Sequence, residues 1–139
     1  MVARIIGLLL GAVLIFIIFI FQIYKGNKKW RQKAEGLQLN RANISKYDFI
    51  KYFLEFGYNE RSINFIYEKT QDYLGNPKFT LLPQDDFLLI YEIDKEEIIY
   101  PILDWLKEYQ SISFNKEEIE TLIKNQRIVD FKFLIGLFN

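Results

Sequence analysis

The first hydrophobic pattern along the chain is an apolar run from Ile5 to Tyr24, which has no charged residue and one strongly polar side chain, Gln22. A helix rises about 1.5 Å per residue, so this run would extend roughly 30 Å, the thickness of the hydrocarbon core of a bilayer. A helix also satisfies its own backbone hydrogen bonds, as lipid requires. The run therefore predicts one membrane-spanning helix.

The pattern then changes to apolar residues that recur every three or four positions, which is typical of amphipathic helices. Polar residues that favour helix starts precede these segments: Ser45 or Asn43, Asn59, Asp94 and Asn115. Gly75-Asn76-Pro77 is a strong stop signal. We expect helices over 46–56, 60–74, 95–109, a short stretch after Asn115, and about 127–137.

Two stretches leave alternatives open. The run FLLIYEI, from Phe87 to Ile93, is compatible with a strand or with a buried turn. Pro101 lies beyond the first turn of the helix expected over 95–109, where it removes a hydrogen bond at a cost of about 3 kcal/mol. Either that helix kinks at Pro101 or it begins later.

Charge is distributed unevenly along the chain. Six of the 18 basic residues and no acidic residue lie in the first 34 positions, and five of the six follow the apolar run. Basic residues beside a span favour the cytoplasmic side, so we expect a single-pass protein of the inner (cytoplasmic) membrane with a cytoplasmic C-terminal domain. A cleaved secretory signal would have a shorter apolar run with the charges before it. The residues expected at the membrane surface, facing anionic lipid, are Lys25, Lys28, Lys29, Trp30, Arg31 and Lys33.

These patterns predict an all-α protein in three parts. Residues 1–26 would form a transmembrane anchor, residues 27–44 a basic juxtamembrane collar and linker, and residues 45–139 a small helical domain. The last part is large enough for one hydrophobic core.

Composition excludes several kinds of chemistry. The sequence contains no Cys and no His, which excludes disulfides, thiolate nucleophiles, the usual zinc sites and His-based acid/base catalysis. From Glu35 onward there are 18 acidic and 12 basic residues, a poor balance for binding nucleic acid. We find no catalytic motif, and we expect no cofactor and no small-molecule substrate.

The densest acidic region comprises Asp85, Asp86, Glu92, Asp94, Glu96 and Glu97. Such carboxylates could bind Ca²⁺ or Mg²⁺, but their spacing is not that of an EF-hand. Paired carboxylates could also serve a glycosidase, although nothing in the sequence supplies a cleft. The remaining interpretations are a partner-binding surface and an ordinary solvated face. We therefore expect no metal site and no catalytic site.

The order of elements from Ile63 onward resembles the acyl carrier protein fold. NERSINFIYEKTQDYLG looks like the first helix of that family, LLPQDDFLLIYEIDKEEIIYPILDWLKEY like the end of its long loop and its second helix, and NKEEIETLIKNQRIVDFKFLI like the third and fourth. Carrier proteins attach phosphopantetheine to a serine that follows an aspartate at the start of the second helix. Here Lys95 follows Asp94, so the resemblance implies no prosthetic arm.

The sequence DKEE is similar to the acidic run of uncharacterised bacterial carrier-like proteins that lack this serine. The resemblance implies a carrier fold kept as a binding module whose acidic second helix faces the partner. The partner-binding residues would be Asp94, Glu96, Glu97, Asp104 and Glu108.

Three functions remain as hypotheses. The first is a non-enzymatic membrane-anchored adaptor, such as an accessory subunit of an inner-membrane complex, that binds a membrane-associated protein. The second is an immunity protein that neutralises a toxin from a neighbouring bacterium. The third, a small enzyme acting on lipid, is disfavoured by the lack of His, Cys and a nucleophile motif.

Overall fold

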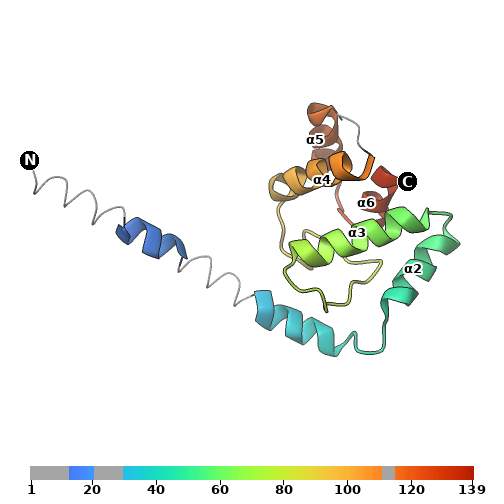
Figure 1. Cartoon of the computed structure of the whole chain (residues 1–139), viewed down its shortest axis with the longest axis horizontal. Helices are drawn as coiled ribbons and strands as arrows, with labels where there is room; N and C mark the ends of the chain where they lie inside the picture. The colour runs from blue at the N-terminus through green and yellow to red at the C-terminus, as the bar shows by residue number, and fades with distance from the viewer. Residues whose placement is uncertain (1–12, 21–29, 111–114) are drawn as a thin grey trace, which may run out of the picture. The chain divides into compact units, whose positions relative to one another are not determined.

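The computed structural model describes residues 13–20, 30–110 and 115–139 of the chain (Figure 1). The chain divides into two compact units, Met1–Ala42 and Asn43–Asn139. Across the described ranges every regular element is a helix, and the β-structure consists of one isolated bridge. The described part of the protein is therefore all-helical.

The first unit contains two described helical stretches, residues 13–20 and 30–39. The predicted span from Ile5 to Tyr24 coincides with the first stretch, and its other positions lie outside the described residues. In the described ranges no helix is long and apolar enough to cross a membrane. The predictions of a transmembrane helix and of a single-pass location in the inner membrane are therefore wrong.

The predicted membrane-surface residues depended on that span. Trp30 and Lys33 are half-buried and Arg31 is exposed in the helix over 30–39. The other three lie outside the described residues: Lys25, Lys28 and Lys29. Without a membrane end beside them, the charge pattern no longer supports an orientation or a lipid-facing collar.

In its described residues the second unit contains five helices and one long loop (Figure 1). The helices are α2 (Lys46–Glu55), α3 (Glu60–Tyr73), α4 (Lys95–Gln110), α5 (Lys116–Asn125) and α6 (Phe131–Phe138). The long loop lies between α3 and α4.

Local capping explains where these helices begin. The Ser45 hydroxyl accepts from the Asp48 amide at 3.2 Å, and the Asp48 carboxylate accepts from the Ser45 amide at 2.8 Å, which completes a capping box. The hydrogen bonds from Ser45 lower the pKa of Asp48. Three other helices have a side-chain cap: Asn59 for α3, Asn115 for α5 and Asp130 for α6. Because Asp130 is the cap, the last helix begins four residues later than expected.

The core of this unit is built around aromatic side chains. The ring of Phe49 on α2 lies 4.9 Å from Tyr67 on α3 and 4.9 Å from Phe131 on α6, centroid to centroid. Phe131 also contacts Phe87 of the long loop at 5.0 Å. All four side chains are buried, and edge-on contacts of this kind add to the stabilisation from burial. The loop is therefore an integral part of the core.

The stretch from Phe87 to Ile93 forms a turn, which decides between the two sequence alternatives. The Phe87 amide donates to the Val129 carbonyl at 2.8 Å, next to the isolated bridge between Asp86 and Asp130. Phe87 and Ile93 are buried, whereas Leu89 is 74% exposed. A strand would have alternated its faces, but here the chain folds back and Ile93 donates to the Phe87 carbonyl at 3.1 Å.

Helix α4 continues through Pro101. Proline has no amide hydrogen, so the carbonyl of Glu97 loses its usual donor within the helix. The fully buried side chains of Ile98, Ile102 and Leu106 lie on both sides of the proline. Their burial offsets the lost hydrogen bond. Of the two alternatives, the later start is therefore wrong, because the helix already begins at Lys95.

Candidate functional site: an acidic helix face and a basic groove

The outer face of α4 is the first candidate surface. The helix buries Ile98, Ile99, Ile102, Trp105 and Leu106, so the opposite side of the helix faces water. All five residues predicted to bind a partner are exposed along this helix or at its start: Asp94, Glu96, Glu97, Asp104 and Glu108. We call these five residues the acidic face.

Two members of the acidic face are held by side chains from α3. The Tyr73 hydroxyl donates to Glu97 at 3.0 Å, and the Lys69 ammonium lies 2.5 Å from the Glu108 carboxylate. Burial raises the pKa of Tyr73, and the hydrogen bond and negative charge of Glu97 raise it further. These contacts fix one edge of the acidic face in place.

The other three members project into solvent. Within the described part of the chain, the structure shows no hydrogen bond or ion pair to the side chains of Asp94, Glu96 or Asp104. Tyr100 lies one turn from both Glu96 and Asp104 and is 61% exposed. The Lys116 ammonium lies 5.0 Å from the centre of the Tyr100 ring, a cation–π contact. The face therefore offers free carboxylates around an exposed aromatic ring.

Asp85 and Asp86 belong to the same acidic region of the sequence but not to this surface. Asp85 accepts from the Tyr91 hydroxyl at 2.6 Å and from the Leu82 amide at 2.9 Å, and Asp86 accepts from the Leu88 amide at 2.8 Å. Both aspartates are buried. Their oxygens shape the loop, and among the described residues no group of three or more acidic side chains could hold a metal ion.

Lys95, which follows Asp94 at the start of α4, has a structural contact. Its ammonium donates to the carbonyl of Lys124 at 3.0 Å and to the carbonyl of Gln126. These carbonyls lie at the C-terminal end of α5, where backbone acceptors lack partners within the helix and the helix dipole favours a cation. Lys95 therefore links the start of α4 to the end of α5.

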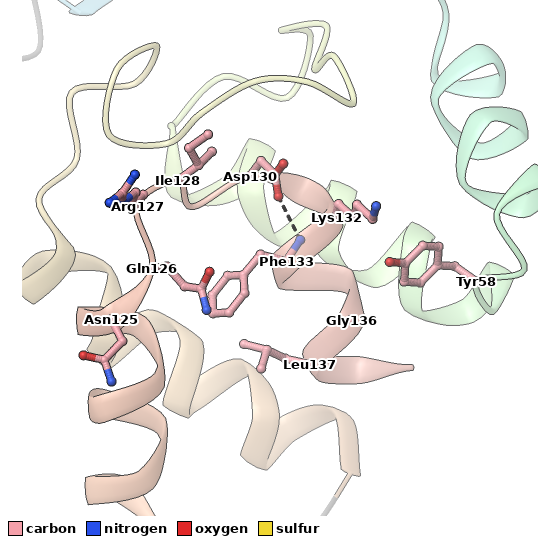
Figure 2. Close-up of a pocket in the computed structure, with 10 residues that line it drawn as sticks. All are labelled: Tyr58, Asn125, Gln126, Arg127, Ile128, Asp130, Lys132, Phe133, Gly136 and Leu137. Carbon is pink, nitrogen blue, oxygen red and sulfur yellow. Dashed lines mark hydrogen bonds between the residues drawn. The ribbon is translucent and has the colours of Figure 1, made fainter.

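A groove of about 710 Å³ is the second candidate surface (Figure 2). It is lined by the segment that joins α5 to α6, by one side of α6, and by Tyr58 from the turn between α2 and α3. Figure 2 shows the Phe133 ring beside Gln126, with Arg127 on one side of this ring and Lys132 pointing toward Tyr58 on the other. The volume lies within the range of small-molecule pockets, about 300–1,000 Å³.

The groove was missed from the sequence. Its two cations, Arg127 and Lys132, are exposed and lie five positions apart in the chain. The sequence did contain one signal: Arg127 and Lys132 are basic residues in the second unit, where 17 acidic residues outnumber 11 basic ones. Two isolated cations in a sequence nonetheless do not reveal that apolar side chains lie between them.

Comparisons with known proteins add no assignment. No family model, no curated protein and no solved structure matches this chain. The resemblance to acyl carrier proteins therefore stays a prediction.

Proposed function

We propose that the second unit is a non-enzymatic protein-binding module that recruits a basic partner through the acidic face of α4. The proposal depends on the arrangement of Glu96 and Asp104 around the exposed ring of Tyr100. Tyrosine is enriched where proteins meet, and complementary charge accelerates encounter and selects the partner. Glu97 and Glu108, held by α3, extend this charge along the same helix.

The proposed fold relationship is a carrier-like bundle without a prosthetic arm. It is supported by the order of α3, a long loop, α4, α5 and α6. It is also supported by Lys95, whose side chain is bound to backbone carbonyls and has no hydroxyl for a phosphodiester. The module would thus use the second helix of the bundle for binding and not for carrying a substrate.

The test compares two variants of the full chain that change net charge equally. Glu96→Lys with Asp104→Lys reverses the acidic face. The control, Glu55→Lys with Asp72→Lys, reverses two exposed carboxylates on α2 and α3 whose side chains make no hydrogen bond or ion pair in the described residues. Each protein carries an affinity tag and is incubated with an extract of the cells that produce it.

We expect the wild type and the control to capture the same protein from the extract in equal yield. The yield of that protein should be about tenfold or more lower with the Glu96/Asp104 variant. The same protein should be released from the wild type by raising the salt concentration, because exposed charges are screened. Equal yields from all three baits would show that the acidic face is ordinary solvated surface.

A further inference from the structure

The groove beside α6 combines apolar walls with two exposed cations, Arg127 and Lys132. Phe133 and Leu137 are half-buried on α6, and Ile128 is 56% exposed in the segment before it. In the described residues, Arg127 makes no ion pair, and Lys132 makes one interaction, with its ammonium 5.9 Å from the centre of the Phe56 ring. An exposed apolar surface flanked by such charges is typical of a binding site.

Within the described residues, Arg127 and Lys132 share with Lys51 and Lys78 the lack of an ion pair, but these two cations lie together at one groove. Several other cations of the unit are paired with carboxylates. Lys46 pairs with Glu68, Lys69 with Glu108, and Lys116 with Glu120. The groove contains one carboxylate, that of Asp130, which accepts from the Phe133 amide at 2.9 Å as the cap of α6. The Asp130 carboxylate is therefore engaged at the start of α6. The carboxylates of a ligand can then pair with Arg127 and Lys132.

The remaining groups of the groove suit a polypeptide. The side-chain amides of Asn125 and Gln126 can each donate to and accept from a peptide backbone, and Figure 2 shows Gln126 beside the Phe133 ring. A nucleic acid would need a longer row of cations than the two that this groove provides. Charge complementarity and the apolar walls together favour an acidic peptide with apolar side chains.

We infer that this groove binds an extended acidic segment of a partner protein. One carboxylate of the segment pairs with Arg127 and another with Lys132, while an apolar side chain between them rests on Phe133 and Leu137. Arg127 can bind its carboxylate through two parallel hydrogen bonds. This inference does not rest on the acidic face of α4.

The test uses a fluorescein-labelled peptide, Asp-Leu-Glu-Phe-Asp-Leu, and fluorescence anisotropy with the full-length protein. Two comparison peptides separate the contributions: Asn-Leu-Gln-Phe-Asn-Leu lacks the charges, and Asp-Ser-Glu-Ser-Asp-Ser lacks the apolar side chains. The variant Arg127→Gln with Lys132→Gln removes both groove cations. The control Lys51→Gln with Lys78→Gln removes two exposed cations elsewhere, so the net charge of the two variants is the same.

We expect the acidic apolar peptide to bind the wild type and the control equally and to bind the Arg127/Lys132 variant about tenfold more weakly. Both comparison peptides should bind the wild type more weakly than the acidic apolar peptide does. In ¹H–¹⁵N spectra of the wild-type protein, the peptide should shift the amide signals of Gln126 to Gly136, which locates the site even if a variant folds poorly.

Several results would overturn the inference. These are no binding at millimolar peptide, equal binding to the Arg127/Lys132 variant, or equal binding of the uncharged peptide. A twelve-nucleotide deoxythymidine strand that outcompetes the peptide would make the groove a nucleic-acid site. Sedimentation that shows self-association of the wild type, abolished by the Arg127/Lys132 change, would make a second copy of the chain the occupant.

Discussion

Carboxylates that are close together in the sequence lie in two opposite environments in this protein. Asp85 and Asp86 are buried and accept hydrogen bonds from Tyr91 and from backbone amides. Asp94 and Glu96, about ten positions later, are exposed and make no such bond in the described residues. A buried carboxylate requires partners, whereas an exposed one is solvated by water and can exchange that water for a ligand. The first pair therefore maintains the fold, and the second is available for recognition.

The largest expected effect tests the structural side of this comparison. Asp85→Ala leaves the Tyr91 hydroxyl and the Leu82 amide without their acceptor in a buried site, so the free energy of unfolding should fall by about 3 kcal/mol. Urea unfolding of the full chain, followed by circular dichroism, measures this change. The exposed Asp72→Ala serves as the control and should change stability by less than about 0.5 kcal/mol.

A double-mutant cycle with Tyr91→Phe makes this test specific. Once the Tyr91 hydroxyl is absent, part of the cost of Asp85→Ala should disappear, because one of the two unpaired donors is no longer there. If the two substitutions are additive, the hydrogen bond between these side chains does not contribute to stability.

The next effect concerns Lys95, which lies between Asp94 and Glu96 in the sequence. Lys95→Ala removes the donor to two carbonyls at the end of α5 and should lower the free energy of unfolding by about 1 kcal/mol. Lys95→Met keeps the apolar stem and should show a similar loss if the ammonium is responsible. Lys107→Ala, an exposed lysine on the same helix, should be nearly neutral. If Lys107→Ala lowered the free energy of unfolding as much as Lys95→Ala, the loss would come from the change in net charge and not from the contact with α5.

A smaller effect is expected in alkaline solution, at the edge of the acidic face. The pKa of Tyr73 is raised in the folded state, so the folded state holds this proton more tightly than the unfolded chain does. Its contribution to stability is complete below the ordinary tyrosine pKa near 10 and is lost as the pH rises above it. Between pH 9 and 11 the melting temperature should fall more steeply for the wild type than for Tyr73→Phe. Parallel profiles would show that burial and the contact with Glu97 do not raise the pKa of Tyr73 in solution.

The smallest expected effect tests the recognition side of the comparison. Glu96→Lys with Asp104→Lys should change the free energy of unfolding by less than about 0.5 kcal/mol, because neither carboxylate has a partner in the described residues. Urea unfolding of this variant beside the Asp85→Ala protein measures the contrast directly. A loss of more than about 2 kcal/mol would show that the acidic face maintains the fold, and the distinction between the two groups of carboxylates would disappear.

The elements of the second unit could be predicted where their cause is local. Ser45, Asn59 and Asn115 each bond to an amide two or three positions ahead, so the residues that start α2, α3 and α5 are adjacent in the sequence. Spacing of apolar residues likewise reports a helix face without knowledge of the fold. Apolar character alone was not sufficient at the N-terminus, where the predicted span from Ile5 to Tyr24 is wrong.

The candidate surfaces depended on contacts that the sequence does not display. The exposed positions of α4 could be derived from its own periodicity, and the resemblance to carrier proteins pointed to its acidic residues as a partner surface. The groove could not, because it needs Tyr58 to lie near Lys132, more than seventy positions away. In the sequence, Lys95 was notable only because carrier proteins have a serine after the corresponding aspartate. Its contact with the end of α5 forms only when the two helices pack together.

The sequence by itself determined that this region is helical, where several of its helices begin, and which kinds of chemistry its lack of Cys and His excludes. The tertiary structure alone decided that Phe87 to Ile93 is a turn, since the amide of Phe87 pairs with Val129, forty-two positions later. It also decided that Asp85 is buried while Asp94 is exposed. The physical reason is that capping and periodicity act within about four residues, whereas burial depends on side chains that folding brings together from distant parts of the chain.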